Sequence, residues 1–185
     1  MDALRIDWRV ASPDGAVVAW LERLGLSLSE GIVSLGPVVL SVVVSEGEDV
    51  DRLEVGGDAR EHAIPGPDGV LLSALGWATV DAERLAAQLG KPLVGEPQPD
   101  PALGATGYRV ASASLPLVLL EPATEGRIAA ALARLGEGPV ALYLDGITLG
   151  AGDDATPLAN TGTGRAGRLL RPARPSGPFV VALEG

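Results

Sequence analysis

The side chains most often used in catalysis are sparse in this chain of 185 residues. Cysteine is absent, so the sequence offers no disulfide, no thiol nucleophile and no thiolate metal site. The single histidine, His62, lies between Glu61 and Ala63. A general base needs an orienting partner and a nucleophile, and these neighbours do not supply both. We therefore interpret His62 as a surface loop residue, with a role as base or metal ligand as the alternative.

Four carboxylates stand at the ends of predicted strands, where they could face a cleft. They are Glu46, Glu121, Asp145 and Glu184. Paired carboxylates can bind a hard cation or perform acid–base chemistry. The same placement is also typical of charged strand ends that face water, and we prefer that interpretation. The catalytic residues stay unknown.

A segment rich in glycine and threonine, residues 151–167, holds two further patterns. Asp153 and Asp154 resemble part of a Ca²⁺ loop but lack oxygen ligands at regular spacing. The run from Thr161 to Gly164 could cradle a phosphate, but it lacks the lysine and the strand–loop–helix setting of a P-loop. We interpret the segment as a surface loop.

Acidic residues outnumber basic residues by 24 to 14, which gives a net charge of −10. Such a chain repels phosphate groups, so we expect no binding to nucleic acid and none to a membrane. The acidity is explained by solubility or, alternatively, by a cationic ligand. The apolar runs are shorter than the roughly 20 residues of a membrane-spanning helix, and the N-terminus shows no signal-peptide pattern. We therefore expect a cytoplasmic protein.

One pattern occurs twice and would position any site: a strand, then an amphipathic helix that ends in Leu-Gly. The first copy is residues 6–25 and the second is residues 71–90. In the second copy Asp81 is the expected helix N-cap, and the glycine that follows the helix is the expected terminator. Trp8 and Trp77 stand in the two strands, one per copy. The repeat predicts two similar modules.

Apolar periods of 2 and of 3.6 residues alternate along the chain, which predicts an α+β fold with pseudo-twofold symmetry. We place a first module at 1–47, a polar connection at 48–69, and a second module at 70–146. Residues 147–185 would form a closing loop and a C-terminal hairpin. The length suits a single domain with a buried core.

These segments resemble the vicinal oxygen chelate superfamily, which includes glyoxalase, bleomycin-resistance and extradiol dioxygenase proteins. The likeness is carried by IDWRVASPDGAVVAWLERLG, by GWATVDAERLAAQLG, and by LEPATEGRIAAALARLGEGPVALYLDG. The resemblance implies a glyoxalase-like domain, with paired βαβββ modules whose sheets curl around a cleft.

Members of this superfamily typically hold a divalent metal ion with His and Glu side chains on the inner faces of the strands. The resemblance places other residues at those positions here: Trp8, Ser41, Val118, Ala182 and the pair Pro139-Val140. Valine and alanine have no lone pair for a metal ion, and the indole of tryptophan is only a donor. We therefore predict no metal ion and no other cofactor.

The two tryptophans would point the same way from equivalent strands if the modules are symmetric. Trp8 and Trp77 then either line an apolar cleft and stack on a flat ligand, or plug the space that a metal ion and substrate would fill. Both alternatives stay open. With Ser41, Tyr108 and Glu121, the two tryptophans form our predicted ligand-binding set.

We therefore predict a metal-free, glyoxalase-like protein that binds a small organic ligand between its modules. One alternative is a metal-independent enzyme of the lyase or isomerase type. A second is sequestration of a cationic drug, which the acidity and the resemblance to resistance proteins would permit. A third is a structural or dimerisation module that forms a homodimer. Metal-dependent glyoxalase or dioxygenase activity is not expected.

Overall fold

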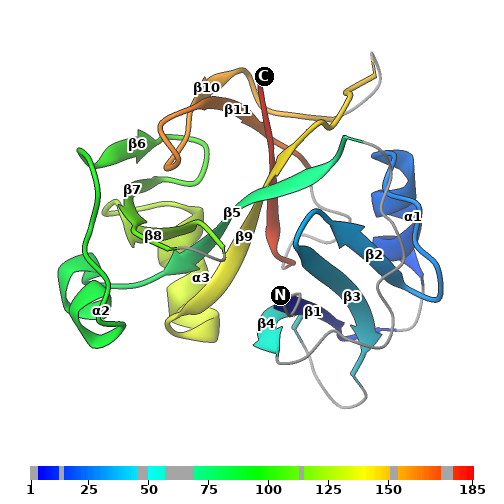
Figure 1. The fold of residues 1–185 in the computed structure, drawn as a ribbon, viewed down its shortest axis with the longest axis horizontal. Coiled ribbons are helices and arrows are strands. Elements are labelled where there is room, and N and C mark those ends of the chain that lie inside the picture. The colour runs from blue at the N-terminus through cyan, green and yellow to red at the C-terminus, as the bar shows by residue number, and fades with distance from the viewer. Residues whose placement is uncertain are drawn as a thin grey trace.

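The computed structural model describes residues 4–12, 15–45, 50–56, 69–112, 115–150, 154–171 and 177–185. Within these residues the chain forms three helices and twelve strands, arranged in two mixed sheets (Figure 1). The predicted α+β class is confirmed. Glu46, His62 and Asp153 lie outside the described residues, so the interpretations given for them stay predictions.

The N-terminal unit is a four-stranded sheet with one helix. Its sheet has the order β2-β3-β1-β4, with β1 parallel to β3 and antiparallel to β4. In β1 the apolar residues are buried and the residues between them are half-buried, as the period of two predicted. The elements are β1 (Leu4–Val10), α1 (Ala16–Arg23), β2 (Ile32–Leu35), β3 (Val38–Val44) and β4 (Arg52–Gly56).

The remainder of the chain builds an eight-stranded sheet in the order β10-β11-β12-β9-β5-β8-β7-β6. Its first half contains β5 (Leu71–Ala78), α2 (Ala82–Gln88), β6 (Gln98–Asp100), β7 (Ala105–Val110) and β8 (Leu117–Pro122). Its second half contains α3 (Arg127–Leu135), β9 (Gly138–Asp145), β10 (Ala159–Asn160), β11 (Ala166–Leu169) and β12 (Phe179–Leu183).

The two halves of this sheet have the same internal order. β5 pairs in parallel with β8, β9 pairs in parallel with β12, and the halves join where β5 and β9 run antiparallel. This palindromic order has the expected pseudo-twofold symmetry, but both halves lie within β5–β12 rather than in the modules expected at 1–47 and 70–146. The partners differ from those expected, because β9, assigned to the module at 70–146, pairs with β12 from the predicted closing hairpin. The Leu-Gly pattern marks a strand and its helix, but it says nothing about which strand lies alongside.

The eight-stranded sheet curls until its two edge strands, β6 and β10, come into contact. The side-chain amide of Asn160 donates a hydrogen bond of 2.9 Å to the carbonyl oxygen of Pro99. Beside this bond, the backbone of Gly107 lies against that of Gly162. A Cβ added to Gly107 would lie 2.7 Å from the Gly162 carbonyl oxygen, so only glycine allows this approach.

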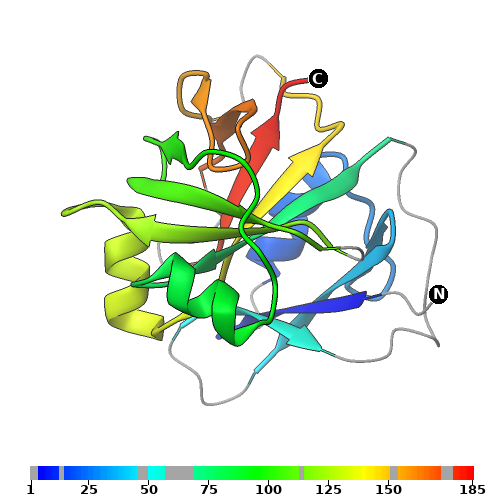
Figure 2. The ribbon, with the colours of Figure 1, turned by 60° about the vertical axis from the view of Figure 1, so that its left-hand side comes forward.

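Helices α2 and α3 lie beside the eight-stranded sheet (Figure 2). Three apolar clusters fill the space between the layers. The interior cluster lies inside the curled sheet under α3 and includes Tyr143, Leu120 and Ile128. The second cluster joins the N-terminal unit to the outer face of the sheet. The third lies under α2. No helix in the described part of the chain is long and apolar enough to cross a membrane.

Candidate functional site

The structure does not bring the two tryptophans of the predicted set together. Trp8 is 1% exposed and belongs to the cluster that joins the N-terminal unit to the large sheet. Its ring packs edge to face against Trp20, with the ring centroids 6.1 Å apart and an interplanar angle of 70°. Trp77 is half-buried and packs against the cluster under α2. The two indoles therefore do not line one common cleft.

Ser41 lies with Trp8 in the N-terminal sheet rather than with the rest of the predicted set. It is a buried residue of β3, opposite Asp7 of β1 and Ile32 of β2. The Ser41 side chain therefore lies in the four-stranded sheet, whereas Trp77 lies on β5 of the eight-stranded sheet.

Trp77, Tyr108 and Glu121 do share one layer of the structure, the one beside α2. Tyr108 packs against the same cluster as Trp77. Burial raises the pKa of the Tyr108 phenol, and the charge and hydrogen bond of Glu121 raise it further. Glu121 also accepts a hydrogen bond of 2.6 Å from the backbone nitrogen of Ala82, in the first turn of α2. These contacts give Glu121 a structural task, fastening α2 to the sheet.

The positions that the resemblance assigns to metal ligands do not supply a donor set. Val118 and Val140 are buried and apolar and lie in the interior cluster. Ala182 lies on the opposite face of the sheet, toward the N-terminal unit. Among the residues described, no group of three His, Cys, Asp or Glu side chains is arranged to hold a metal ion. Valine and alanine at these described positions therefore offer no lone pair to a metal ion.

Two of the strand-end carboxylates, Asp145 and Glu184, are paired with arginines. Arg165 binds Asp145 with two bonds of 2.8 and 2.6 Å, and these bonds lower the pKa of the Asp145 carboxyl. Arg168 contacts Glu184 at 3.4 Å. These pairs match the interpretation of charged strand ends that face water, and neither forms an acid–base pair of two carboxylates.

The Thr-Gly run at Thr161 satisfies its own polar groups. The Thr161 hydroxyl contacts the Thr163 hydroxyl at 2.8 Å and donates to the Arg165 carbonyl oxygen at 2.9 Å. The backbone nitrogen of Gly162 donates to Asp100 at 2.9 Å, inside the curled sheet. Because the Gly162 backbone nitrogen already donates to a buried carboxylate, it is not free to bind a phosphate. We therefore interpret this loop as a link between the edges of the sheet and not as an anion site.

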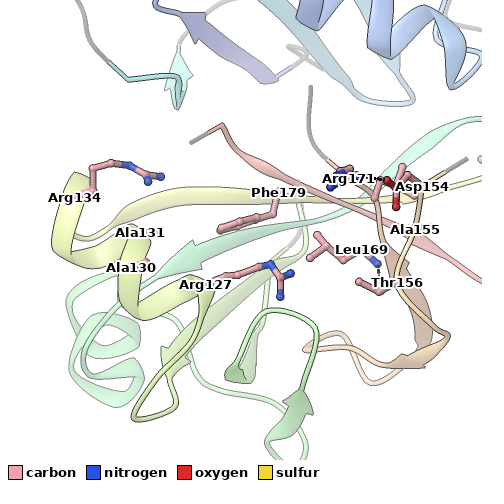
Figure 3. Close-up of a pocket in the computed structure, with 11 residues that line it drawn as sticks. Arg127, Ala130, Ala131, Arg134, Asp154, Ala155, Thr156, Leu169, Arg171 and Phe179 are labelled. Atoms are coloured by element: carbon pink, nitrogen blue, oxygen red, sulfur yellow. Dashed lines mark hydrogen bonds and ion pairs between the residues drawn. The ribbon is translucent and has the colours of Figure 1, made fainter. Parts of the chain in front are cut away.

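A pocket of about 550 Å³ lies at one end of the curled sheet, between α3 on one side and β11 and β12 on the other (Figure 3). Its volume is that of a site for a small organic molecule. Its floor is apolar, with Leu169, Leu170 and Phe179 each less than 9% exposed. The residues that line it are Arg127, Ala130, Ala131, Arg134, Asp154, Ala155, Thr156, Leu169, Leu170, Arg171 and Phe179.

Among the described residues of the lining, three arginines outnumber one carboxylate, in a protein whose net charge is −10. Arg127 and Arg134 are seven residues apart on α3 and therefore project from the same side of the helix. In Figure 3 the ring of Phe179 lies between them, and Arg127 extends toward Thr156 across the pocket. One nitrogen of Arg127 donates to the Ala102 carbonyl oxygen at 2.7 Å, which holds the guanidinium in place. We name these eleven lining residues the arginine pocket.

Sequence reasoning did not find the arginine pocket. The signal available was the spacing of Arg127 and Arg134 on a strongly amphipathic helix, with Ala130 and Ala131 between them leaving room for a ligand. Arg171, which follows β11, and Phe179 of β12 come near α3 only through the order of the sheet. That order was not visible in the sequence, because no local pattern specifies which strands pair.

No family model and no curated protein matches this chain. Solved structures do match. Methylmalonyl-CoA epimerase from Mycobacterium tuberculosis is 18% identical, with 63% of this chain and 87% of that chain covered and a TM-score of 0.49. A 4-hydroxymandelate synthase variant from Streptomyces coelicolor is 14% identical, with 97% and 69% covered and a TM-score of 0.44. A glyoxalase I variant from Zea mays is 12% identical, with 100% and 70% covered and a TM-score of 0.36.

These solved structures are an epimerase, a synthase variant and a glyoxalase variant, and each is less than 25% identical to this chain. Their TM-scores lie below 0.5, so the fold assignment here stands on the paired half-sheets described above. These matches carry no argument about activity or ligands.

Proposed function

We propose that this protein binds a small organic anion in the arginine pocket without the help of a metal ion. The observation that carries the proposal is the three guanidinium groups over an apolar floor, in a chain that is otherwise acidic. Guanidinium groups present a rigid fork of donors that matches the two oxygens of a carboxylate or phosphate. The small organic ligand is the one expected from the sequence, but its proposed site is the arginine pocket and not the predicted ligand-binding set.

The floor of the pocket indicates the kind of body that the anion carries. Phe179 offers an aromatic ring at the base of the pocket, and Leu169 and Ala131 offer aliphatic surface beside it. A flat ring or a short alkyl group packs on such a surface, while the charged head meets the arginines at the rim. An aromatic carboxylate combines both features and is therefore the probe of choice.

The same charge balance disfavours sequestration of a cationic drug at this place. The single carboxylate of the lining, Asp154, is already paired with Arg171. A cation would meet three arginines there, and the acidity of the whole chain does not offset them at short range. A metal-independent enzyme stays an alternative without an observation in its favour, since Asp154 is the one carboxylate among the described residues of the lining.

Isothermal titration of the purified chain with benzoate, in a buffer free of organic anions, tests the proposal. We expect benzoate to bind and its affinity to fall as salt is added. Arg127→Gln should weaken binding by about fivefold, because ~1 kcal/mol of charge–charge attraction is lost. Arg23→Gln is the matched control, because it removes the same charge from the exposed end of α1.

Two results would count against the proposal. Benzoate and its dicarboxylate relatives could fail to bind at all, or Arg127→Gln and Arg23→Gln could leave the same affinity. A stoichiometric content of zinc, nickel, manganese or iron in the purified protein would overturn the metal-free part separately.

A further inference from the structure

One arginine of the pocket already has a resident counter-ion. A guanidinium nitrogen of Arg171 contacts a carboxylate oxygen of Asp154, and the Arg171 backbone nitrogen donates to the Asp154 carbonyl oxygen at 2.8 Å. Figure 3 shows the two side chains together at one end of the arginine pocket, away from Arg134. The backbone bond keeps the two residues adjacent whether or not their side chains are paired.

This ion pair is easily exchanged. The side chain of Arg171 is 76% exposed and that of Asp154 is 62% exposed, so water screens the attraction between them. Exposed pairs of this kind contribute little to stability, and here one guanidinium nitrogen makes the contact with the carboxylate. A ligand carboxylate of suitable reach can therefore replace Asp154 on Arg171 at small cost.

Arg127, unlike Arg171, contacts an uncharged partner. It donates to the Ala102 backbone carbonyl oxygen, which is uncharged, so its positive charge is not neutralised by that contact. A first anionic group of a ligand is accordingly expected at Arg127. Any negative charge placed nearby also meets Asp154, which repels it unless the ligand offers a second anionic group that takes over Arg171.

We propose that the preferred ligand of the arginine pocket is a dianion, with one anionic group on Arg127 and a second that displaces Asp154 from Arg171. This inference rests on the proposed function and narrows it to a class, small dicarboxylates with an aromatic or short aliphatic body. Asp154 competes for Arg171: it occupies that guanidinium in the free protein, and a ligand gains Arg171 only when a second anionic group displaces it.

The test compares benzoate with its three dicarboxylate relatives, phthalate, isophthalate and terephthalate. These probes keep one ring and vary the separation of the two carboxylates. Titrations are made with the wild-type chain and with the R171Q and D154N variants. The controls, R23Q and E22Q, remove the same charges on α1, where both side chains are exposed.

We expect at least one dicarboxylate to bind the wild-type protein several-fold more tightly than benzoate. R171Q should remove this advantage and leave the affinity for benzoate nearly unchanged. D154N should tighten the binding of the preferred dicarboxylate by a few-fold, since no resident carboxylate competes. The two control variants should leave both affinities as they are in the wild-type protein.

Equal affinities for benzoate and all three dicarboxylates would overturn the inference and leave the proposed function standing. The same holds if R171Q weakens benzoate and the dicarboxylates by one common factor. Failure of every probe to bind would overturn the proposed function and this inference together. Because both substituted side chains are largely exposed, the variants are expected to fold, and a thermal denaturation curve for each verifies it.

Discussion

The phenolic oxygen of Tyr143 donates a hydrogen bond of 2.9 Å to a carboxylate oxygen of Asp100, inside the curled eight-stranded sheet. Neither residue exposes any surface. The same carboxylate accepts from the backbone nitrogens of Leu103 at 3.1 Å and Gly162 at 2.9 Å. Donors from β9, from the turn after β6 and from the loop after β10 thus converge on one carboxylate, which fastens both edges of the sheet to its centre.

Removal of the Tyr143 hydroxyl should show how much its hydrogen bond to Asp100 contributes to the free energy of unfolding. Tyr143→Phe leaves the Asp100 carboxylate with two donors instead of three, and we expect a loss of about 1–3 kcal/mol in the free energy of unfolding. Urea denaturation measures it. Tyr108→Phe is the comparison at a half-buried position: it removes the hydrogen bond to Glu121, and we expect a smaller loss because water can reach the group left behind. Equal losses for the two variants would contradict a special role of the buried pair.

Asp100 should also give the protein a distinct dependence on pH. Burial raises the pKa of its carboxyl above the ordinary value of 3.8, and the hydrogen bonds from Gly162, Tyr143 and Leu103 offset the rise only in part. The folded state therefore holds the proton more tightly than the unfolded state. This stabilisation is complete below pH 3.8 and is lost as the pH rises through the folded-state pKa.

Comparison with Asp100→Asn isolates this contribution. As the pH rises from 3.8 toward neutrality, the wild-type protein should lose stability relative to the variant, because only the wild-type carboxyl must give up its proton in a buried place. Urea midpoints over this range measure the difference, and Glu96→Gln at an exposed position is the control. A constant offset between wild type and Asp100→Asn at every pH would contradict the prediction.

The elements that the sequence predicted well are those set by local chemistry. Asp81 is the N-cap of α2, and its side chain accepts a hydrogen bond from the Arg84 backbone nitrogen at 2.8 Å, as its position before the helix indicated. The strand expected at the start of the second copy, residues 71–90, is β5 (Leu71–Ala78). Each depends on neighbours in the sequence, so a pattern of a few residues determines it.

The site was not predictable in the same way. Trp8 and Trp77 occupy matching places in the repeat, yet one is enclosed by the N-terminal unit and the other lies under α2. The arginine pocket needs β12 beside β9, so that Phe179 reaches the foot of α3. Such pairings are fixed by the packing of the whole sheet, and a one-residue change of register would point every side chain to the other face.

Because Gly107 lies so close to Gly162, alanine at position 107 should destabilise the protein more than alanine at a glycine with open space around it. Gly107→Ala would force a Cβ to 2.7 Å from the Gly162 carbonyl oxygen, where backbone rather than a flexible side chain must move. We expect a loss of about 1–3 kcal/mol in the free energy of unfolding. Gly138→Ala in β9 meets no atom within 4 Å and should change stability by less than about 0.5 kcal/mol. Similar denaturation midpoints for the two variants would show that β7 and the loop after β10 are not in contact.

Glu137 should determine how the junction between β5 and α2 responds to acid. Hydrogen bonds from the Thr79 hydroxyl at 2.6 Å, the Val80 backbone nitrogen at 2.9 Å and the Arg84 guanidinium at 2.5 Å lower the pKa of its carboxyl from 4.5 to about 2. The folded state therefore favours the charged carboxylate. Its contribution to stability is present above pH 4.5 and is lost as the pH falls from 4.5 to about 2.

Glu137→Gln should abolish this acid sensitivity, so that the difference in stability between wild type and variant shrinks as the pH falls. The Glu137 side chain is 33% exposed, so water screens its ion pair with Arg84. The bonds from Thr79 and Val80 should therefore dominate, and Arg84→Gln should reproduce only a minor part of the effect. Unfolding followed by far-UV circular dichroism in the acid range measures it, with Glu22→Gln on α1 as control. An unchanged gap between wild type and Glu137→Gln down to the most acid condition would show that these bonds do not hold the carboxylate in its charged form.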